Sequence, residues 1–301
     1  TVAVSVSAGV AAITSALPEL YPWRVGLALG AVAIVTLVNL RGVRESGAVF
    51  AVPTYFFVAT MFTLVVAGLV RLYAGGGAPE PTAPSEAPAV TASLTTFLVL
   101  RAFSSGCTAL AGVEAISNAV PIFKPPESVN AGKTLLWMGG ILVSMFLGIT
   151  FLVNSYHLAP TQGETVVSQL ARAVFGGGPL YFAVQAATAL ILLLAANTSY
   201  AGFPRLAMWM ARDRYLPRPL ANLGDRLVFG NGILLLGVLA SALIVIFRAE
   251  THALIPLYAV GVFTAFTLSQ LGMVRHWFRL RTPGWKHSAV INGLGAITTA
   301  V

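Results

Sequence analysis

Residues 95–121 read TTFLVLRAFSSGCTALAGVEAISNAVP, and this stretch is long enough to cross a bilayer as one helix. Its middle differs from an ordinary membrane span, because small and polar side chains gather there together with two glycines. These residues are Ser104, Ser105, Gly106, Cys107, Thr108, Gly112, Glu114, Ser117 and Asn118. Glycine weakens a helix. We therefore predict a membrane helix that is broken near its centre.

The composition of the whole chain agrees with a membrane protein. Of the 301 residues, 57% are apolar and only 9% are charged, whereas a soluble domain has about 25% charged residues. So few charges cannot cover a soluble globule, which excludes soluble enzymes, nucleic-acid binders and disordered chains. The single cysteine excludes an intrachain disulfide. The net charge of +8 is best explained by basic cytoplasmic loops.

Nine apolar segments are candidate membrane spans, and they lack the alternation of an outer-membrane barrel. They are residues 1–17, 24–41, 48–73, 95–121, 134–156, 179–202, 230–248, 252–275 and 287–301. We predict an all-α fold, a polytopic transmembrane helix bundle, with residues 1–301 forming a single transporter domain. The chain starts and stops inside apolar runs, so we expect it to be an excerpt of a longer protein, incomplete at both ends.

The distribution of Lys and Arg predicts the orientation of the spans. Every second connection between spans is rich in Lys and Arg, and these connections hold thirteen such residues together. The other connections hold four, which are Arg24, Arg71, Arg172 and Arg248. Basic loops mark the cytoplasmic side, so the first segment runs from inside to outside. Aromatic residues fall near the span ends, and we interpret them as interfacial anchors: Tyr21, Trp23, Tyr73, Tyr156 and Tyr181 outside, and Trp137, Trp209, Tyr215, Trp277 and Trp285 inside.

Glu114 is the strongest candidate for a functional side chain, because it alone among the acidic residues lies deep in a predicted span. A carboxylate in hydrocarbon is costly, so such a group normally faces the bundle interior or a water-filled cavity. It can be buried more easily as a neutral acid, which suits a group that takes up and releases a proton. The alternative is structural, since a lone Glu can simply form a hydrogen bond with a neighbouring helix.

Two kinds of ligand suit a broken helix at membrane depth. Backbone carbonyls and the hydroxyls of Ser105 and Thr108 suit a desolvated cation, whereas free amides around residues 104–108 suit a substrate carboxylate. Tyr258 lies within a span and is better placed for a site than the anchor tyrosines. The other Ser and Thr residues in spans are mostly packing groups. The chain shows no catalytic triad, phosphate loop or zinc-protease motif, so we predict no enzyme and no cofactor.

Three motifs carry a family resemblance. Residues 106–126, GCTALAGVEAISNAVPIFKPP, and residues 203–224, FPRLAMWMARDRYLPRPLANLG, resemble the sixth helix and an inner stretch of the amino acid–polyamine–organocation (APC) superfamily. Together with residues 1–16, TVAVSVSAGVAAITSA, the GVEAISN motif is similar to the KimA-type potassium uptake branch of that superfamily. The resemblance covers essentially the whole chain, as helices three to eleven of about twelve in that fold.

The resemblance implies a LeuT-like inverted-repeat fold of five plus five helices, in which the first and sixth helices are broken at the midplane. It also implies an ion and proton site lined by Thr1, Ser5, Glu114 and Tyr258. Ala111 stands where the branch has Thr, so Thr108 or a backbone carbonyl would have to supply that oxygen. The first two helices of the fold lie outside this chain.

These observations together predict a proton-coupled secondary transporter in the plasma membrane of a bacterium, a multi-pass protein with cytoplasmic basic loops. It would import a small cation, K⁺ foremost, by alternating access, with Glu114 as the proton-coupling site. The substrate-binding candidates are Thr1, Ser5, Ser105, Thr108, Glu114 and Tyr258. Its partners would be the cation or an amino acid, H⁺ and the lipid bilayer, not nucleic acid; a homodimer is one assembly that the sequence allows.

Other functions fit parts of the pattern. An amino-acid/H⁺ symporting permease would have the same fold and would hold the substrate carboxylate on the amides of residues 104–108. A solute receptor or sensor would bind without transport. A membrane enzyme lacks support from paired catalytic groups, and an ion channel would show flux that does not saturate at carrier-like rates.

Overall fold

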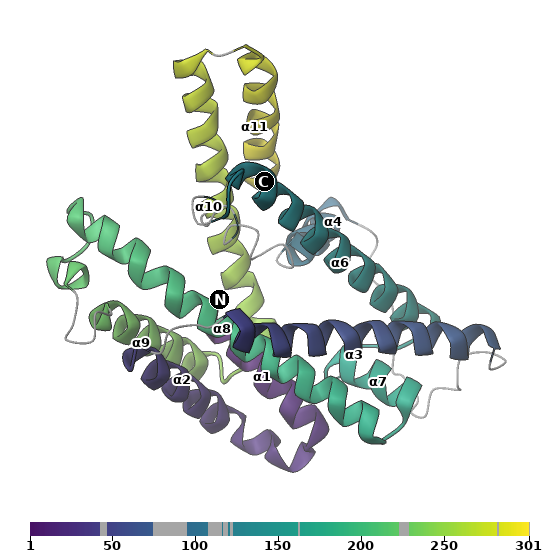
Figure 1. The fold of residues 1–301 in the computed structure, drawn as a ribbon. Helices are drawn as coiled ribbons and strands as arrows, with labels where there is room; N and C mark the ends of the chain where they lie inside the picture. The colour runs from purple at the N-terminus through teal and green to yellow at the C-terminus, as the bar shows by residue number, and fades with distance from the viewer. Residues whose placement is uncertain are drawn as a thin grey trace. The chain divides into compact units, whose positions relative to one another are not determined.

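The computed structural model describes residues 1–42, 47–74, 95–107, 116, 120, 123–161, 163–222, 229–281 and 283–300 (Figure 1). Within these residues the chain is helical and contains no β-strand. The α-helices are α1 (Val2–Ala16), α2 (Arg24–Leu40), α3 (Gly47–Ala74), α4 (Thr96–Cys107), α6 (Glu127–Ser155), α7 (Val166–Phe175), α8 (Pro179–Arg212), α9 (Gly230–Ile246), α10 (Thr251–Leu280) and α11 (Trp285–Ala300). Two short 3-10 helices are η1 (Pro18–Trp23) and η4 (Arg218–Ala221).

The structure confirms the predicted fold class, an all-α polytopic membrane protein. A described helix overlaps each of the nine predicted spans, and in the segment 95–121 the described residues are 95–107, which include α4, and residues 116 and 120. Within the described residues, five helical stretches are long and apolar enough to cross a membrane. They are Pro18–Leu40, Phe50–Ala74, Glu127–Ser155, Pro179–Arg212 and Thr251–Leu280. The inverted repeat of five plus five helices stays a prediction.

The chain divides into two compact units. The first comprises residues 1–91 and 115–251, and therefore holds α1 to α3 and α6 to α9. The second comprises residues 92–114 and 252–301, and holds α4, α11 and nearly all of α10. That residues 1–301 act as a single transporter domain stays a prediction.

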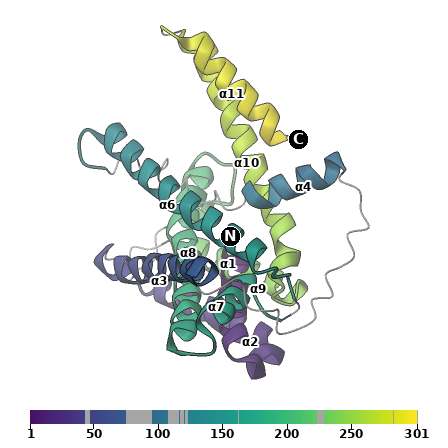
Figure 2. The same ribbon diagram turned by 90° about the vertical axis from the view of Figure 1, so that its right-hand side faces the viewer.

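Helix α1 lies at the centre of the first unit and packs along α8 (Figures 1 and 2). The two helices are antiparallel, because Ser15 meets Tyr181 while Gly9 meets Ala189. A Cβ at Gly9 would lie 3.4 Å from the Ala189 carbonyl oxygen, so the small residue permits this close approach. Helix α1 also contacts α2, α7 and α9, and most of its residues are buried.

A second packing centre joins α3, α6, α7 and α8. Its buried residues are Met61, Leu64, Val65, Met145, Leu152, Tyr156, Leu170, Ala171, Val174, Tyr181 and Val184. Helix α7 was not among the predicted spans, since it has only ten residues. It is amphipathic, and its apolar positions 167, 170, 171 and 174 recur with helical spacing against this core.

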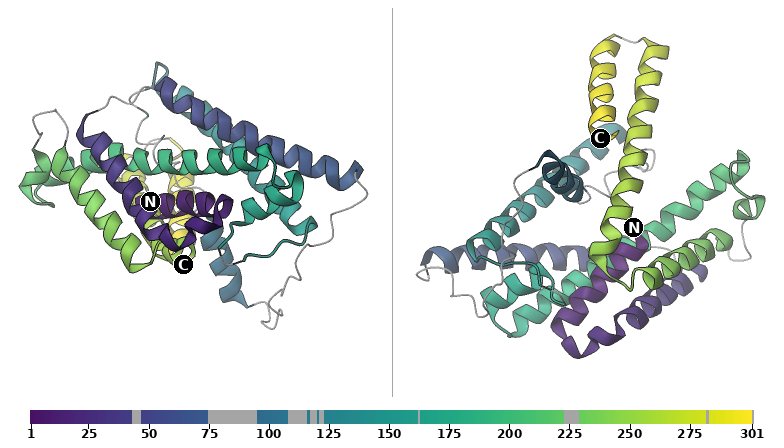
Figure 3. Two further views of the ribbon diagram at one scale, coloured as in Figure 1. Left: turned by 90° about the horizontal axis from the view of Figure 1, so that it is seen from below. Right: turned by 180° about the vertical axis from the view of Figure 1, so that it is seen from behind.

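Neighbouring helices in each unit run in the directions that alternating spans require. Helices α2 and α9 are antiparallel, with Gly237 against Thr36 and Gly230 against Leu40 (Figure 3). In the second unit, α10 and α11 are antiparallel, with Thr267 hydrogen-bonded to Thr299 and Gly295 packed against Gln270.

Candidate functional site

Two of the predicted ligands lie at the start of α1. Thr1 is the exposed residue that precedes α1, and Ser5 lies one turn further along and is only 9% exposed. Because they are four residues apart, Thr1 and Ser5 lie on the same face of the helix. Ser5 is therefore a buried hydroxyl at the start of the most enclosed helix of the unit.

The remaining predicted ligands are distributed differently. Ser105 is exposed on α4, and Tyr258 is half-buried on α10; both belong to the second unit. Thr108, Glu114 and also Ala111 lie outside the described residues. A joint site of Thr1, Ser5, Ser105, Thr108, Glu114 and Tyr258 therefore stays a prediction, as does the break near the centre of the segment 95–121.

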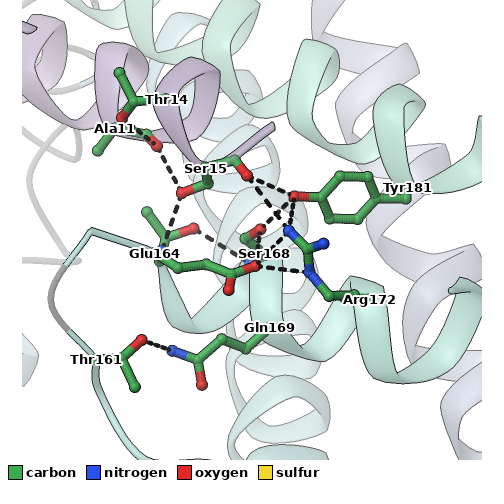
Figure 4. A network of polar contacts seen from close by, with 10 residues as sticks. Ala11, Thr14, Ser15, Thr161, Glu164, Ser168, Gln169, Arg172 and Tyr181 are labelled. Carbon is green, nitrogen blue, oxygen red and sulfur yellow. Dashed lines mark hydrogen bonds and ion pairs between the residues drawn. The ribbon is translucent and has the colours of Figure 1, made fainter. Parts of the chain in front are cut away.

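The structure brings together a polar cluster that the sequence analysis missed (Figure 4). Glu164 Oε1 accepts hydrogen bonds from Ser168 Oγ at 2.7 Å and from Arg172 Nε at 3.1 Å. Arg172 Nη2 also lies 3.1 Å from the same carboxylate oxygen, which makes a salt bridge. Thr165 caps α7 by accepting a hydrogen bond from the Ser168 amide. The start of α7 is thus tied to the loop before it.

Tyr181 joins this cluster to α1 and α8. Its hydroxyl donates to the Ser15 carbonyl oxygen at 2.9 Å, accepts from Arg172 Nη2 at 3.0 Å, and lies 2.8 Å from Ser168 Oγ. The Arg172 guanidinium also lies over the Tyr181 ring, 4.9 Å from its centroid. Carbonyls in the last turn of a helix lack intrahelical partners, and a cation near them is favourable. The cluster therefore supplies hydrogen-bond donors to the Ser15 carbonyl oxygen in the last turn of α1.

The interpretation of two tyrosines as interfacial anchors was wrong. Tyr156 and Tyr181 are only 3% and 2% exposed, and the Tyr156 hydroxyl donates to the Gly68 carbonyl oxygen at 3.1 Å. Both hydroxyls satisfy backbone carbonyls inside the first unit. Trp23 and Tyr73, by contrast, are exposed as interfacial anchors should be.

A cavity of about 500 Å³ adjoins the polar cluster within the first unit. It is lined by Thr14, Ser15, Pro18, Tyr21, Gly163, Glu164 and Arg172. Its walls come from the end of α1, from η1, from the loop before α7 and from Arg172 in the last turn of α7. Carbonyl, hydroxyl and charged groups thus meet at one end of α1.

Polar residues in the predicted spans also join helices directly. Asn39 Nδ2 on α2 donates to Asn197 Oδ1 on α8 at 2.6 Å, and Thr36 Oγ1 lies 2.8 Å from the Tyr200 hydroxyl. These bonds support the packing role predicted for most hydroxyls in spans. Two further polar atoms of this unit, Ser7 Oγ and Gln185 Nε2, are buried without a partner among the described residues.

The described residues hold no group of three or more His, Cys, Asp or Glu side chains suited to a metal ion. The candidate cation ligands are hydroxyl and carbonyl oxygens, together with the carboxylate of Glu114 predicted from sequence.

Long apolar helices, packed through small residues and polar contacts, define a multi-pass, all-helical membrane protein. Comparison with known proteins narrows this class. The family model for amino acid permeases matches residues 1–301. The chain belongs to the amino acid permease family. This finding confirms the APC resemblance predicted from the sequence motifs.

The chain is also similar to a curated bacterial protein, "Potassium transporter KimA" of Bacillus subtilis (strain 168). The two are 48% identical over 297 residues, which cover 99% of this chain and 49% of that protein. The chain thus spans about half the length of this relative.

Proposed function

We propose that the protein containing this chain is a proton-coupled secondary transporter that imports a small cation, K⁺ foremost, by alternating access. The observation that carries this proposal is the 48% identity to a potassium transporter along 99% of the chain. Family membership across residues 1–301 supports transport of a small solute. In this proposal residues 1–301 form one domain that corresponds to helices three to eleven.

The proposed ion site uses oxygen ligands from three segments of the chain. Thr1 and Ser5 contribute hydroxyls from α1, and the burial of Ser5 supports its use as a ligand in a desolvated site. Ser105 contributes from α4, Thr108 from the predicted span 95–121, and Tyr258 from α10. Alkali cations are held by such neutral oxygens in place of their hydration shell.

Glu114 is the proposed proton-coupling group. In the neutral form it costs little to bury, and in the charged form it is stabilised by a bound cation or by a water path. Alternation between these forms would couple proton movement to the opening of one side of the membrane or the other. Its solitary position among the acidic residues supports this role.

We place the protein in the plasma membrane with its basic loops in the cytoplasm. The antiparallel packing of α1 with α8 and of α10 with α11 supports the strict alternation of spans on which this orientation rests. Under this orientation, the cavity beside Glu164 and Arg172 opens on the outer side.

The full-length protein in liposomes tests the substrate. We expect K⁺ uptake that saturates with K⁺ concentration and rises when an inward proton gradient is imposed. Flux that does not saturate would indicate a channel, and K⁺ binding without flux would indicate a receptor; either result would overturn the proposal.

The second candidate is an amino-acid/H⁺ symporting permease, which the description of the matching family favours. The same liposomes discriminate the two, because uptake of a labelled amino acid that K⁺ does not affect would support this permease. Competition by amino acids is not expected for the cation carrier.

A further inference from the structure

Helix α1 is attached to its surroundings through polar contacts at one point. Within the described part of the chain, the hydrogen bonds that join α1 to other elements all end on Ser15. Ser15 Oγ accepts from the Thr165 amide at 3.1 Å, and its carbonyl oxygen accepts from Tyr181 at 2.9 Å and from Arg172 at 3.5 Å. Against the other described residues, the rest of α1 is held by packing.

The surface of α1 that packs against its neighbours carries no long or aromatic side chains, because the helix is built from small and β-branched residues, VAVSVSAGVAAITSA. Small residues let helices approach closely, but they provide few large side chains that interlock and oppose sliding along the axis. A polar attachment at one end is therefore the feature that fixes the axial position of α1 against α8.

The groups that hold Ser15 are themselves fixed. Glu164 orients the Arg172 guanidinium by accepting a hydrogen bond from its Nε at 3.1 Å and by an ion pair with its Nη2 at 3.1 Å, and Arg172 in turn covers the Tyr181 ring. The far end of α7 is held by Arg71, whose Nη1 donates to the Val174 carbonyl oxygen at 2.7 Å. The apolar face of α7 is buried in the core with α3, α6 and α8.

We propose that Tyr181, oriented by the Glu164–Arg172 pair, is a positioning residue that sets the axial position of α1 and thereby places Thr1 and Ser5 in the cation site. Ser5 lies ten residues from Ser15 on one straight helix, about 15 Å along its axis. A shift at Ser15 is therefore transmitted to Ser5 almost undiminished. This inference rests on the proposed cation transport.

The test is K⁺ uptake by the full-length protein in liposomes, with Tyr181→Phe as the principal variant. The change removes the hydroxyl, with its bonds to Ser15 and Arg172, but keeps the ring, its packing and the guanidinium of Arg172 above the ring. We expect the KM for K⁺ to rise about threefold to tenfold, the equivalent of one lost hydrogen bond, while the maximal rate per folded protein is retained. A reduced maximal rate with an unchanged KM would show a merely structural role and would overturn the proposal.

Gln169→Ala is the matched control. Gln169 lies on α7, the helix that carries Arg172, and its amide donates to Thr161 Oγ1 at 2.8 Å, away from Ser15. We expect its KM to equal that of the wild type. If Gln169→Ala raised the KM as much as Tyr181→Phe, the effect would belong to α7 as a whole and not to the attachment at Ser15.

Charge reversal separates this attachment from a simple ion pair. The double variant Glu164→Arg with Arg172→Glu restores opposite charges, but a carboxylate at position 172 cannot donate to Tyr181 or to the Ser15 carbonyl oxygen. We expect the KM for K⁺ of the double variant to be higher than that of the wild type. Full recovery of the wild-type KM would contradict the proposal.

A distance measurement tests the attachment without transport. Spin labels at the exposed positions Glu19 and Ala186, in a Cys107→Ser background, report on the end of α1 relative to α8. We expect a narrow distance distribution that Tyr181→Phe shifts or broadens and Gln169→Ala does not. An unchanged distribution in Tyr181→Phe overturns the proposal, whereas a wild-type protein without K⁺ flux overturns only the proposed function.

Discussion

Individual hydroxyl and amide groups join helices where the sequence offers few other polar contacts. Thr36 and Tyr200 connect α2 to α8 at 2.8 Å, and Asn39 donates to Asn197 one turn away at 2.6 Å. Gly237 of α9 makes room for the first pair, because a Cβ there would lie 2.8 Å from Thr36 Oγ1. In a bilayer, such interhelical hydrogen bonds contribute modestly, on average about 0.6 kcal/mol each.

Tyr200→Phe should lower the stability of the protein in detergent by roughly 0.5–2 kcal/mol, because the half-buried Thr36 hydroxyl loses this partner. A double-mutant cycle with Thr36→Val, read by thermal unfolding, gives the coupling energy. Tyr55→Phe on α3 is the control, since Tyr55 is 73% exposed. Additive effects of Tyr200→Phe and Thr36→Val would show that the two side chains do not interact.

At the scale of single residues, the sequence shows which side chains could act as anchors or ligands, but it does not show what surrounds each of them in the fold. Tyr156 and Tyr181 have the sequence position of interfacial anchors, but both hydroxyls bind backbone carbonyls in the interior. Position near a span end does not distinguish the two cases, because the face that a tyrosine presents depends on which helix packs beside it. Ser5, in contrast, was predicted as a site residue and is buried.

The crossing of α3 and α6 depends on two glycines. A Cβ at Gly148 would lie 2.7 Å from Val65 Cγ1, and one at Gly68 would lie 2.6 Å from Leu152 Cδ1. Valine has one strongly preferred side-chain rotamer in a helix, so Val65 cannot easily move away. The close approach of these helices thus requires a residue without a side chain at position 148.

Gly148→Ala should therefore destabilise the protein by about 1–3 kcal/mol through overpacking. Gly140→Ala on the same helix is the matched control, because nothing lies within 4 Å of its added Cβ. Alanine at that position should leave the unfolding temperature unchanged or raise it, as alanine favours the helix by up to about 1 kcal/mol. Equal unfolding temperatures for the two variants would contradict the close packing.

The elements that sequence could predict are the long apolar ones. Helix α7 was missed because a search for spans needs about 20 apolar residues, and α7 has ten, with Gln169 and Arg172 among them. The apolar positions 167, 170, 171 and 174 are its signal, together with Thr165 as a capping residue. The partners of Glu164 and Arg172 follow only once α7 is recognised as a helix.

For the whole molecule, orientation in the membrane is the most accessible property. Glu19→Cys on η1 should react with an impermeant thiol reagent on intact cells, whereas Asp213→Cys after α8 should react only in permeabilised cells. Both positions are exposed, and Cys107→Ser removes the thiol found within residues 1–301. The reason is the excess of Lys and Arg in the connections on the Asp213 side. The reverse pattern of labelling would show that the predicted orientation is wrong.

The fold class could be predicted because the length and composition of each apolar run decide it locally. The family could be predicted from the motifs at residues 106–126 and 203–224, and the match across residues 1–301 confirms it. The candidate site could be predicted only as a set of residues. Its geometry depends on contacts between segments far apart in sequence, and those contacts leave no local pattern.

The most direct test of cation transport through Glu114 is K⁺ uptake by the full-length protein in liposomes, measured with and without an inward proton gradient for the wild type and Glu114→Gln. We predict that the gradient accelerates uptake by the wild type and has no effect on the variant, whose amide cannot exchange a proton. Glu127→Gln, a change at the exposed start of α6, should behave like the wild type. Proton-driven K⁺ uptake that Glu114→Gln leaves intact would contradict the central claim.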